Sequence, residues 1–292
     1  AEKQILDKMY KFPTLHQWGN FQSMTEFHMS NDNDLFRTTQ VGPPLFCGFM
    51  MHMFRHDFAQ PNQWLVAAGA EARETKKAEG RIPIAIRKAN PNITFKISAN
   101  EYKLVWRATS NPTNTRTLIS TVIPPNFTGN NLNCLVPIDF NEKKKDYVKP
   151  VSNPETVFVC GMFNSFVVDY VMRRKMGSTN INNFMIYELP IPRYDPKNEF
   201  HKVILESSAK LICTTDEFAD LRTEIGIKDG ETDAEKRFAL ITRINAYAAK
   251  IYDLTIEELE LVLESFPIVD QPEDWANSLK LQKAILDEFS SI

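Results

Sequence analysis

The sequence lacks the features of a membrane-embedded or secreted protein. In its 292 residues there is no uninterrupted apolar run of the roughly 18 to 20 residues that a transmembrane helix needs. The first residues do not show the charged and then apolar regions of a signal peptide. A hydrophobic content of 43% with 24% charged residues is typical of a globular protein with a core of its own. We therefore expect a cytoplasmic protein without a membrane partner.

Cysteine is scarce and scattered, which argues against a disulfide framework or a zinc site. There is no CxxC pair, and no cysteine lies close to a pair of histidines. His52 and His56 have the spacing of a helical metal-binding pair, but no third ligand accompanies them. Their surroundings, Phe46 to Phe58, are rich in Met and Phe, so buried packing is the favoured interpretation. We expect reduced thiols in the core at Cys47, Cys134, Cys160 and Cys213, and no metal.

No constellation of catalytic residues stands out either. The chain has no strand followed by a glycine-rich turn and an acidic residue, as a cofactor site of a doubly wound fold would require. The paired acids Glu257 and Glu258 follow Thr255, and Thr255 with Glu258 has the pattern of a capping box that starts a helix. No nucleophile and base converge elsewhere. We expect that this chain is not a complete enzyme by itself.

Charge is unevenly distributed along the chain. Residues 1–198 contain 24 basic and 17 acidic residues, whereas residues 199–292 contain 10 basic and 20 acidic ones. Between Arg81 and Leu118 there are seven Lys or Arg residues against one acid, Glu101. Cations that neutralise phosphates release counterions, and an acidic surface is repelled by the duplex. The pattern favours nucleic-acid contact by the first two thirds of the chain.

The segment from Tyr102 to Asn126 predicts a β-hairpin. Two strand-like runs, Tyr102 to Ala108 and Thr117 to Ile123, flank a turn rich in Asn, Pro and Thr. Cations and amides alternate with apolar residues, so we expect a polar face that touches an anionic partner. The alternative is a solvated sheet face whose charges only prevent edge aggregation.

A core helix is predicted from Thr156 to Met176, after a start at Asn153-Pro154. Its final cations are predicted either to lie near a duplex or merely to complement the helix dipole. The loop Gly177 to Phe184 follows, and its amides could read base edges or simply form turns. The residues in question are Arg173, Arg174, Asn180, Asn182 and Asn183.

Taken together, the hairpin, the core helix and the C-terminal helical patterns predict an α+β protein. A β-rich recognition region precedes an α-helical C-terminal region. We divide it into an N-terminal packing segment, 1–43, a β-rich target-recognition domain, 44–198, and a helical support domain, 199–292. Prolines at 190, 192 and 196 separate the last two. The predicted C-terminal helices cover residues 199–212, 215–225, 233–252, 255–264 and 272–289.

Several short motifs, in this order, resemble the C-terminal, target-recognizing half of adenine-specific DNA methyltransferases. The closest resemblance is to the large enzymes of type IIG, type IIL and BREX systems. The motifs span most of the chain. They are Pro44-Leu45-Phe46-Cys47-Gly48-Phe49-Met50-Met51-His52, Tyr102-Lys103-Leu104-Val105-Trp106-Arg107, Arg116-Thr117-Leu118-Ile119, Ile123-Pro124-Pro125, Gly161-Met162-Phe163-Asn164-Ser165, Leu189-Pro190-Ile191-Pro192, Ile251-Tyr252-Asp253-Leu254-Thr255, Glu257-Glu258-Leu259 and Ser265-Phe266-Pro267.

The chain also departs from that family. The Asn/Asp-Pro-Pro-aromatic motif that grips the flipped adenine is absent, since Pro124-Pro125 follows Ile123. Phe49 stands where the family often has Lys, and Asp57 stands where a basic residue is common. The resemblance therefore implies a recognition half without its catalytic half, and a start at Ala1 rather than Met is what we expect of an excised piece.

What the resemblance implies is a double-stranded DNA recognition domain of an enzyme that methylates adenine from S-adenosylmethionine, in some members alongside an endonuclease. Its partners would be DNA and an N-terminal methyltransferase domain of the parent chain; no cofactor is expected in this part. The alternative is a protein-docking domain of a defence-system complex. The other expected DNA-binding residues are Arg87, Lys88, Lys96, Lys103, Arg107, Asn111, Asn114 and Arg116.

Overall fold

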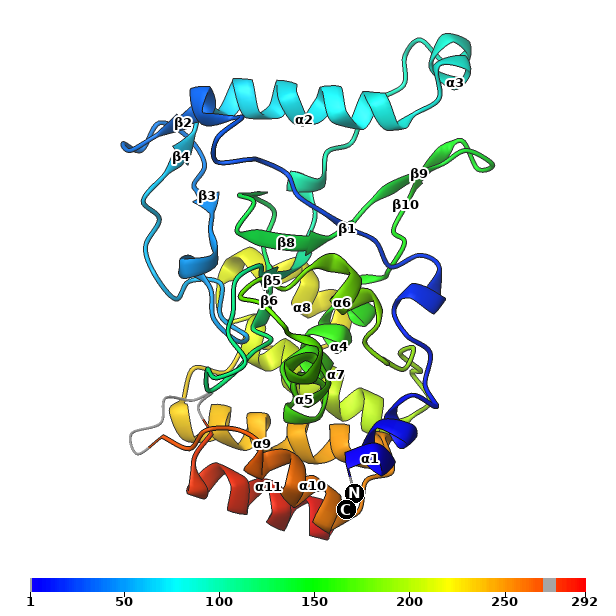
Figure 1. Ribbon diagram of the computed structural model, residues 1–292. Coiled ribbons are helices and arrows are strands. Elements are labelled where there is room, and N and C mark those ends of the chain that lie inside the picture. Colours follow the sequence, from blue (N-terminus) through cyan, green and yellow to red (C-terminus); the bar gives the residue numbers. More distant parts are fainter. Residues whose placement is uncertain (1, 270–276) are drawn as a thin grey trace.

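A four-stranded antiparallel sheet lies at the centre of the fold (Figure 1). The structure is a computed structural model and describes residues 2–269 and 277–292. The strand order is β1-β8-β5-β6. Figure 1 shows α2 (Ala67–Arg81) above β1 and β8, and α9 (Ala234–Ile251), α10 (Ile256–Glu264) and α11 (Leu279–Ser291) at the opposite end of the molecule. The strands are β1 (Ser23–Met24), β5 (Lys103–Arg107), β6 (Ser120–Ile123) and β8 (Leu132–Leu135).

The predicted hairpin is present, because β5 and β6 pair antiparallel with Lys103 opposite Ile123 and Trp106 opposite Ser120. The predicted polar face is wrong. Every residue of β6 and the first four residues of β5 are buried. The reason is that β8 covers the other edge of β5 and helix α4 (Asn153–Phe163) packs against both strands of the hairpin.

Short strand pairs surround the central sheet. The pair β9–β10 forms a ribbon that projects away from the rest of the fold (Figure 1). The strands β3 and β7 pair in parallel, whereas β2 pairs antiparallel with β4. The bounds are β2 (Phe36–Arg37), β3 (Leu45–Phe46), β4 (Trp64–Leu65), β7 (Phe127–Thr128), β9 (Asp139–Asn141) and β10 (Asp146–Val148), with 3-10 turns η1 (His16–Trp18), η2 (Asn33–Leu35), η3 (Gly48–Met50), η4 (Ser98–Asn100) and η5 (Asp216–Phe218).

The helix predicted from Thr156 to Met176 is two helices, α4 and α5 (Phe166–Lys175), which are bent by 71° at their junction. A capping box of Ser152 and Glu155 starts α4, with the predicted proline in its first turn. Ser165 caps α5 by accepting from the backbone of Val168, so it starts a new helix. No single helix in the described ranges is long and apolar enough to span a membrane, and the bent pair passes that test by length and composition only.

The C-terminal region is helical, as predicted. The predicted capping box of Thr255 and Glu258 starts α10. Of the last predicted helix, residues 272–276 lie outside the described ranges, and the helix runs from Leu279. The remaining bounds are α1 (Glu2–Met9), α2 (Ala67–Arg81), α3 (Ile84–Ala89), α6 (Asn183–Tyr187), α7 (Glu199–Ile212), α8 (Ala219–Ile225), α9 (Ala234–Ile251), α10 (Ile256–Glu264) and α11 (Leu279–Ser291).

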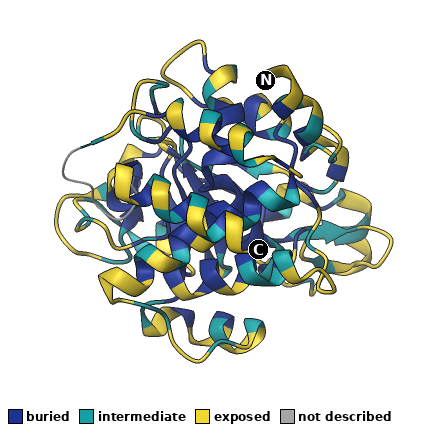
Figure 2. Cartoon of the chain, turned by 90° about the horizontal axis from the view of Figure 1, so that it is seen from below, coloured by how far each residue is buried: buried dark blue, intermediate teal, exposed yellow. Residues whose placement is uncertain are grey.

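One continuous hydrophobic core joins the sheet to the helices, from Ile5 in α1 to Phe289 in α11. Figure 2 shows the buried residues gathered between exposed outer helix faces. Aromatic rings form part of this junction. The ring centre of Trp106 in β5 lies 6.1 Å from that of Phe163 in α4 and 6.4 Å from that of Phe21. The α+β class is confirmed, and the sheet is held rigidly by the helices beneath it.

Candidate nucleic-acid interface

The turn that follows β5 lies beside the loop that precedes α6. The backbone of Ser110 donates to the carbonyl of Thr179 at 2.9 Å, and Ile181 donates to Ala108 at 2.8 Å. Thr109 and Asn180 form a β-bridge between these hydrogen bonds. The turn after β5 and the loop before α6, about 70 residues apart in sequence, therefore form one continuous surface. Asn180 lies next to the turn.

The turn itself is fixed by its own side chains. The Asn111 side-chain oxygen accepts from both the backbone and the hydroxyl of Thr113 at 2.9 Å. The carbonyl of the exposed Asn114 accepts from Arg173 at 2.5 Å. Such side-chain to backbone bonds replace a flexible loop with one conformation. The half-buried Asn111 and the exposed Asn114 are thus held in one conformation.

Arg107 occupies the centre of this region at the end of β5. Its Nε donates to the carbonyl of Gly48 at 2.9 Å and its Nη2 to that of Met51 at 2.5 Å. Partial burial lowers the pKa of the guanidinium. Arg107 lines two open hollows, of about 430 Å³ and about 440 Å³. The described residues that line them include no carboxylate; they are Gly48, Phe49, His52, Phe58, Arg107, Thr109, Thr113, Asn114, Thr115, Arg116, Ile119 and Asn131.

We call this surface the polar loop face and define it by residues with amide, hydroxyl or guanidinium groups. Sequence reasoning found four of them, and the structure brings these four together although they come from three segments. It missed the other three. For Asn131 the sequence offered a signal, the turn-forming run Gly129-Asn130-Asn131 before β8. In the structure the side-chain oxygen of Asn131 accepts from the backbone of Gly48 at 3.2 Å. The residues are Arg107, Thr109, Asn111, Thr113, Asn114, Asn131 and Asn180.

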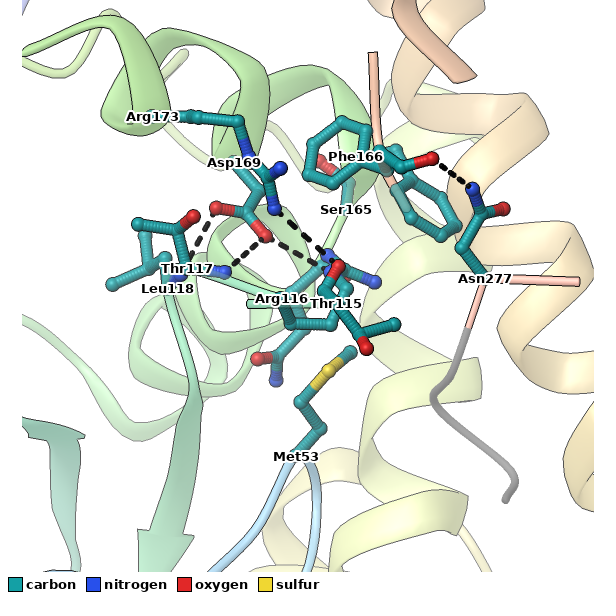
Figure 3. Close-up of polar contacts among 12 residues, drawn as sticks. Met53, Thr115, Arg116, Thr117, Leu118, Ser165, Phe166, Asp169, Arg173 and Asn277 are labelled. Carbon is teal, nitrogen blue, oxygen red and sulfur yellow. Dashed lines mark hydrogen bonds and ion pairs between the residues drawn. The ribbon is translucent and has the colours of Figure 1, made fainter. Parts of the chain in front are cut away.

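The prediction that Arg116 lies on the surface is wrong. Arg116 is 2% exposed, and its Nε donates to Oδ2 of Asp169 at 2.9 Å. The same carboxylate accepts from the backbone of Thr117 at 3.0 Å and Leu118 at 2.9 Å (Figure 3). The guanidinium also lies 4.1 Å from the centre of the Phe166 ring. Burial lowers the pKa of Arg116, and Asp169 opposes that shift. Arg116 joins the hairpin to α5.

Lys103 is buried for the same physical reason. Its ammonium is 2.8 Å from both oxygens of Glu26, and both side chains are fully buried. Glu26 also accepts from Ser98 at 2.5 Å and from the backbone and hydroxyl of Thr128 at 2.7 and 2.8 Å. Since every oxygen has partners, the pair is a structural tie between the N-terminal segment and the sheet. The prediction of a surface role for Lys103 is wrong.

The other predicted cations lie elsewhere. Arg87 forms an ion pair with Glu79, while Lys88 and Lys96 are exposed, with Lys96 Nζ 5.6 Å from the Tyr147 ring centre. Arg87 and Lys88 belong to α3, which Figure 1 places well apart from the end of β5, and Lys96 lies against Tyr147 of β10. The structure thus separates these residues from the polar loop face.

The residues at the end of α5 already have protein partners. Arg173 lies 4.2 Å from the Phe266 ring centre, and Arg174 pairs with Glu2 at 2.6 Å. Asn182 is exposed at the start of α6, and the side-chain oxygen of Asn183 is buried without a hydrogen bond among the described residues. Of this set Asn182 and Asn180 are the amides most open to solvent.

The four cysteines are free and buried, as predicted. Burial raises the pKa of Cys134 and of Cys160 to about 12, so both are held as neutral thiols. His52 and His56 do not lie on a helix; His52 instead pairs with Arg55 across a tight turn. Within residues 2–269 and 277–292, no three His, Cys, Asp or Glu side chains gather as a metal site.

Comparison with known proteins gives one kind of match. No protein family model matches the sequence, and no curated protein matches it. Among solved structures, the chain is similar to the Type IIL restriction-modification enzyme MmeI in complex with DNA, with 12% identity and a TM-score of 0.43. That similarity covers 84% of this chain and 35% of the other, so the chain spans about a third of the length of this structural neighbour.

Proposed function

We propose that the chain is the region of an adenine-specific DNA methyltransferase that recognises a sequence in double-stranded DNA. The observation that supports this most directly is the polar loop face. It gathers exposed amides and hydroxyls around one guanidinium, on a turn fixed by its own hydrogen bonds, and no carboxylate lines its hollows among the described residues. Amides pair with adenine edges and Arg pairs with guanine, whereas a carboxylate would be repelled by phosphates.

The rigid support beneath this face also favours recognition. The buried pair of Arg116 and Asp169 and the backbone bridge at Thr109 fix the turn relative to α5 and α6. A side chain that reads a base must be held within a fraction of an ångström. Arg116, which the sequence suggested for DNA contact, serves this purpose from the interior.

Exposed cations on the rest of the molecule would set position on the duplex through phosphates. Lys88 and Lys96 are exposed, and so are Lys143 to Lys145 at the tip of the β9–β10 ribbon. Phosphate contacts carry no sequence information but supply much of the affinity. The methyl transfer from S-adenosylmethionine, and any endonuclease activity, would belong to other domains of the parent enzyme.

The proposal is tested by selecting randomised duplexes with the 292-residue chain at about 50 and 200 mM salt. Enrichment of one short motif, with affinity that falls steeply as salt rises, is the expected result. Asn114→Ala should then relax the motif at one position at a cost of about 1 to 3 kcal/mol. Lys88→Gln should weaken all sequences equally. Absence of binding at both salt concentrations would reject the proposal and leave a protein-docking domain.

A further inference from the structure

We propose that the hollow between Phe49 and Phe58 holds one unstacked nucleobase of the bound DNA. This inference rests on the proposed function and gives the polar loop face a second mode of recognition. The hollow is the one of about 430 Å³ that Arg107 lines. Its volume falls within the about 300 to 1,000 Å³ of sites that bind small molecules.

Two aromatic side chains, Phe49 and Phe58, line this hollow. Phe49 is 42% exposed and Phe58 is 37% exposed, which places both among the large apolar side chains that this chain leaves open to water. Phe49 belongs to η3, and the backbone of Phe58 donates to Met50 of the same turn at 2.9 Å. This hydrogen bond holds the two backbone segments together, and the Phe58 ring also lies 5.1 Å from the His52 ring and 5.7 Å from the Arg55 guanidinium. Aromatic faces stack on any base with little dependence on its identity.

Side chains that can donate hydrogen bonds line the same hollow. Arg107 uses Nε and Nη2 for the carbonyls of Gly48 and Met51. Its Nη1 and the hydroxyl of the exposed Thr109 make no hydrogen bond to any described residue, and both residues line the hollow. The edges of bases offer ring nitrogens and carbonyl oxygens as acceptors, so a guanidinium and a hydroxyl complement them.

The same composition distinguishes a base from a phosphate. A phosphate would gain from several cations or backbone donors, but it gains nothing from two phenyl rings. A planar ring gains from both the rings and the donors. The side chain of Arg107 is itself fixed by two carbonyls, so it can define the depth to which a base enters. The base must leave the duplex stack, and stacking on the exposed Phe49 ring offsets part of that cost.

The test compares two duplexes that differ at one unpaired residue, a bulged adenosine in one and a bulged abasic residue in the other. The full chain should bind the adenosine duplex more tightly. Phe49→Ala should weaken binding to the adenosine duplex roughly fivefold to a hundredfold, the range that stacking on one ring supplies. Binding to the abasic duplex should change little. Phe49→Trp should restore the preference, because indole stacks at least as well as phenyl.

Tyr10→Ala is the matched control. Tyr10 is 41% exposed, close to the value for Phe49, but it follows α1 on the side of the molecule where the C-terminal helices lie (Figure 1). It should leave both affinities unchanged. Phe49→Leu, which keeps an apolar side chain, serves if the alanine variant unfolds; it should lose most of the preference for the adenosine duplex.

Equal losses on both duplexes would overturn the inference, because they would show that Phe49 supports the fold or wedges between paired bases. No preference of the unaltered chain for adenosine would overturn it as well. Failure of the unaltered chain to bind any DNA would instead reject the proposed function, and the inference with it. The two failures are therefore distinguishable by the unaltered chain alone.

Discussion

Arg116 and Asp169 form an ion pair in the interior of the protein, with 2.9 Å between Nε and Oδ2 and exposed side-chain fractions of 1% and 0%. Asp169 at the same time accepts from two backbone N–H groups at the start of the segment that leads into β6. One carboxylate on α5 therefore fixes both the side chain and the backbone of the turn that carries the polar loop face.

We predict that Asp169→Ala lowers the free energy of unfolding by about 3 to 5 kcal/mol, since it leaves a buried guanidinium unpaired and two N–H groups without an acceptor. Arg116→Ala should cost a similar amount. Urea unfolding measures both. Arg81→Ala, at an exposed position, is the control and should stay within about 0.5 kcal/mol of the parent. A loss of DNA affinity in Arg116→Ala at unchanged stability would contradict this structural role.

A second prediction concerns Glu26 and Lys103, which are both fully buried. Glu26→Gln leaves the ammonium without a counter-charge and should cost about 3 to 5 kcal/mol. Lys103→Met leaves the carboxylate unpaired and should also destabilise. The double variant, Glu26→Gln with Lys103→Met, should recover most of the loss, because no unpaired charge remains buried. Additive losses in urea unfolding would show that the two charges do not stabilise each other.

These two ion pairs mark the limit of what the sequence could predict. Lys and Arg are rarely fully buried, so a run of cations predicts an exposed surface unless their partners are known. The partner of Lys103 lies 77 residues away in sequence and that of Arg116 lies 53 residues away. No local pattern connects such residues. Two cations of the basic segment, Lys103 and Arg116, were expected on the surface and are buried.

Features with short-range causes were predictable. The capping box at Thr255 and the β5–β6 hairpin depend on residues that are close in sequence, and both are present as predicted. The break between α4 and α5 was missed because the apolar periodicity continues through it. The Asn164-Ser165 pair was the available signal, since Ser165 caps α5 and Asn164 exchanges hydrogen bonds with the backbone of Ser120.

Gly161 provides a third prediction. A Cβ at this position would come within 2.8 Å of Ile204 Cγ2 and would also collide with the side chain of Ser208. Helices α4 and α7 are therefore too close at this point for any side chain larger than that of glycine. Gly161→Ala should destabilise, because overpacking costs about 1 to 3 kcal/mol and exceeds the helix-propensity gain of at most about 1 kcal/mol.

Gly80→Ala is the matched control for this substitution. Gly80 lies in α2, is exposed, and has nothing within 4 Å of an added Cβ. The same change should therefore stabilise the protein by about 0.5 to 1 kcal/mol. Opposite signs in thermal or urea unfolding are the expected outcome, and a stabilised Gly161→Ala would show that the two helices can separate without cost.

The fourth prediction is a pH dependence that arises from His52. Burial, together with the nearby cations Arg107, Arg116 and Arg55, lowers its pKa from 6.5 to about 3. Its Nδ1 accepts from the backbone of Met53 at 2.8 Å, which a protonated ring could not do. Below pH 6.5 His52 is protonated in the unfolded chain but stays neutral in the folded chain. Stability should therefore fall as the pH falls from about 6.5 towards 3, by up to about 1.4 kcal/mol per pH unit.

Urea unfolding of the parent, of His52→Gln and of His16→Gln between pH 7 and 4 isolates this contribution. Above pH 6.5 the histidine adds no pH dependence, because it is neutral in both states. Below it, His52→Gln should lose stability less steeply than the parent, whatever its stability at pH 7. His16 is exposed, so its replacement should leave the slope of the parent. Parallel slopes for the parent and His52→Gln would mean that the folded protein accepts the proton at His52, and that the turn from Met51 to Arg55 opens to admit it.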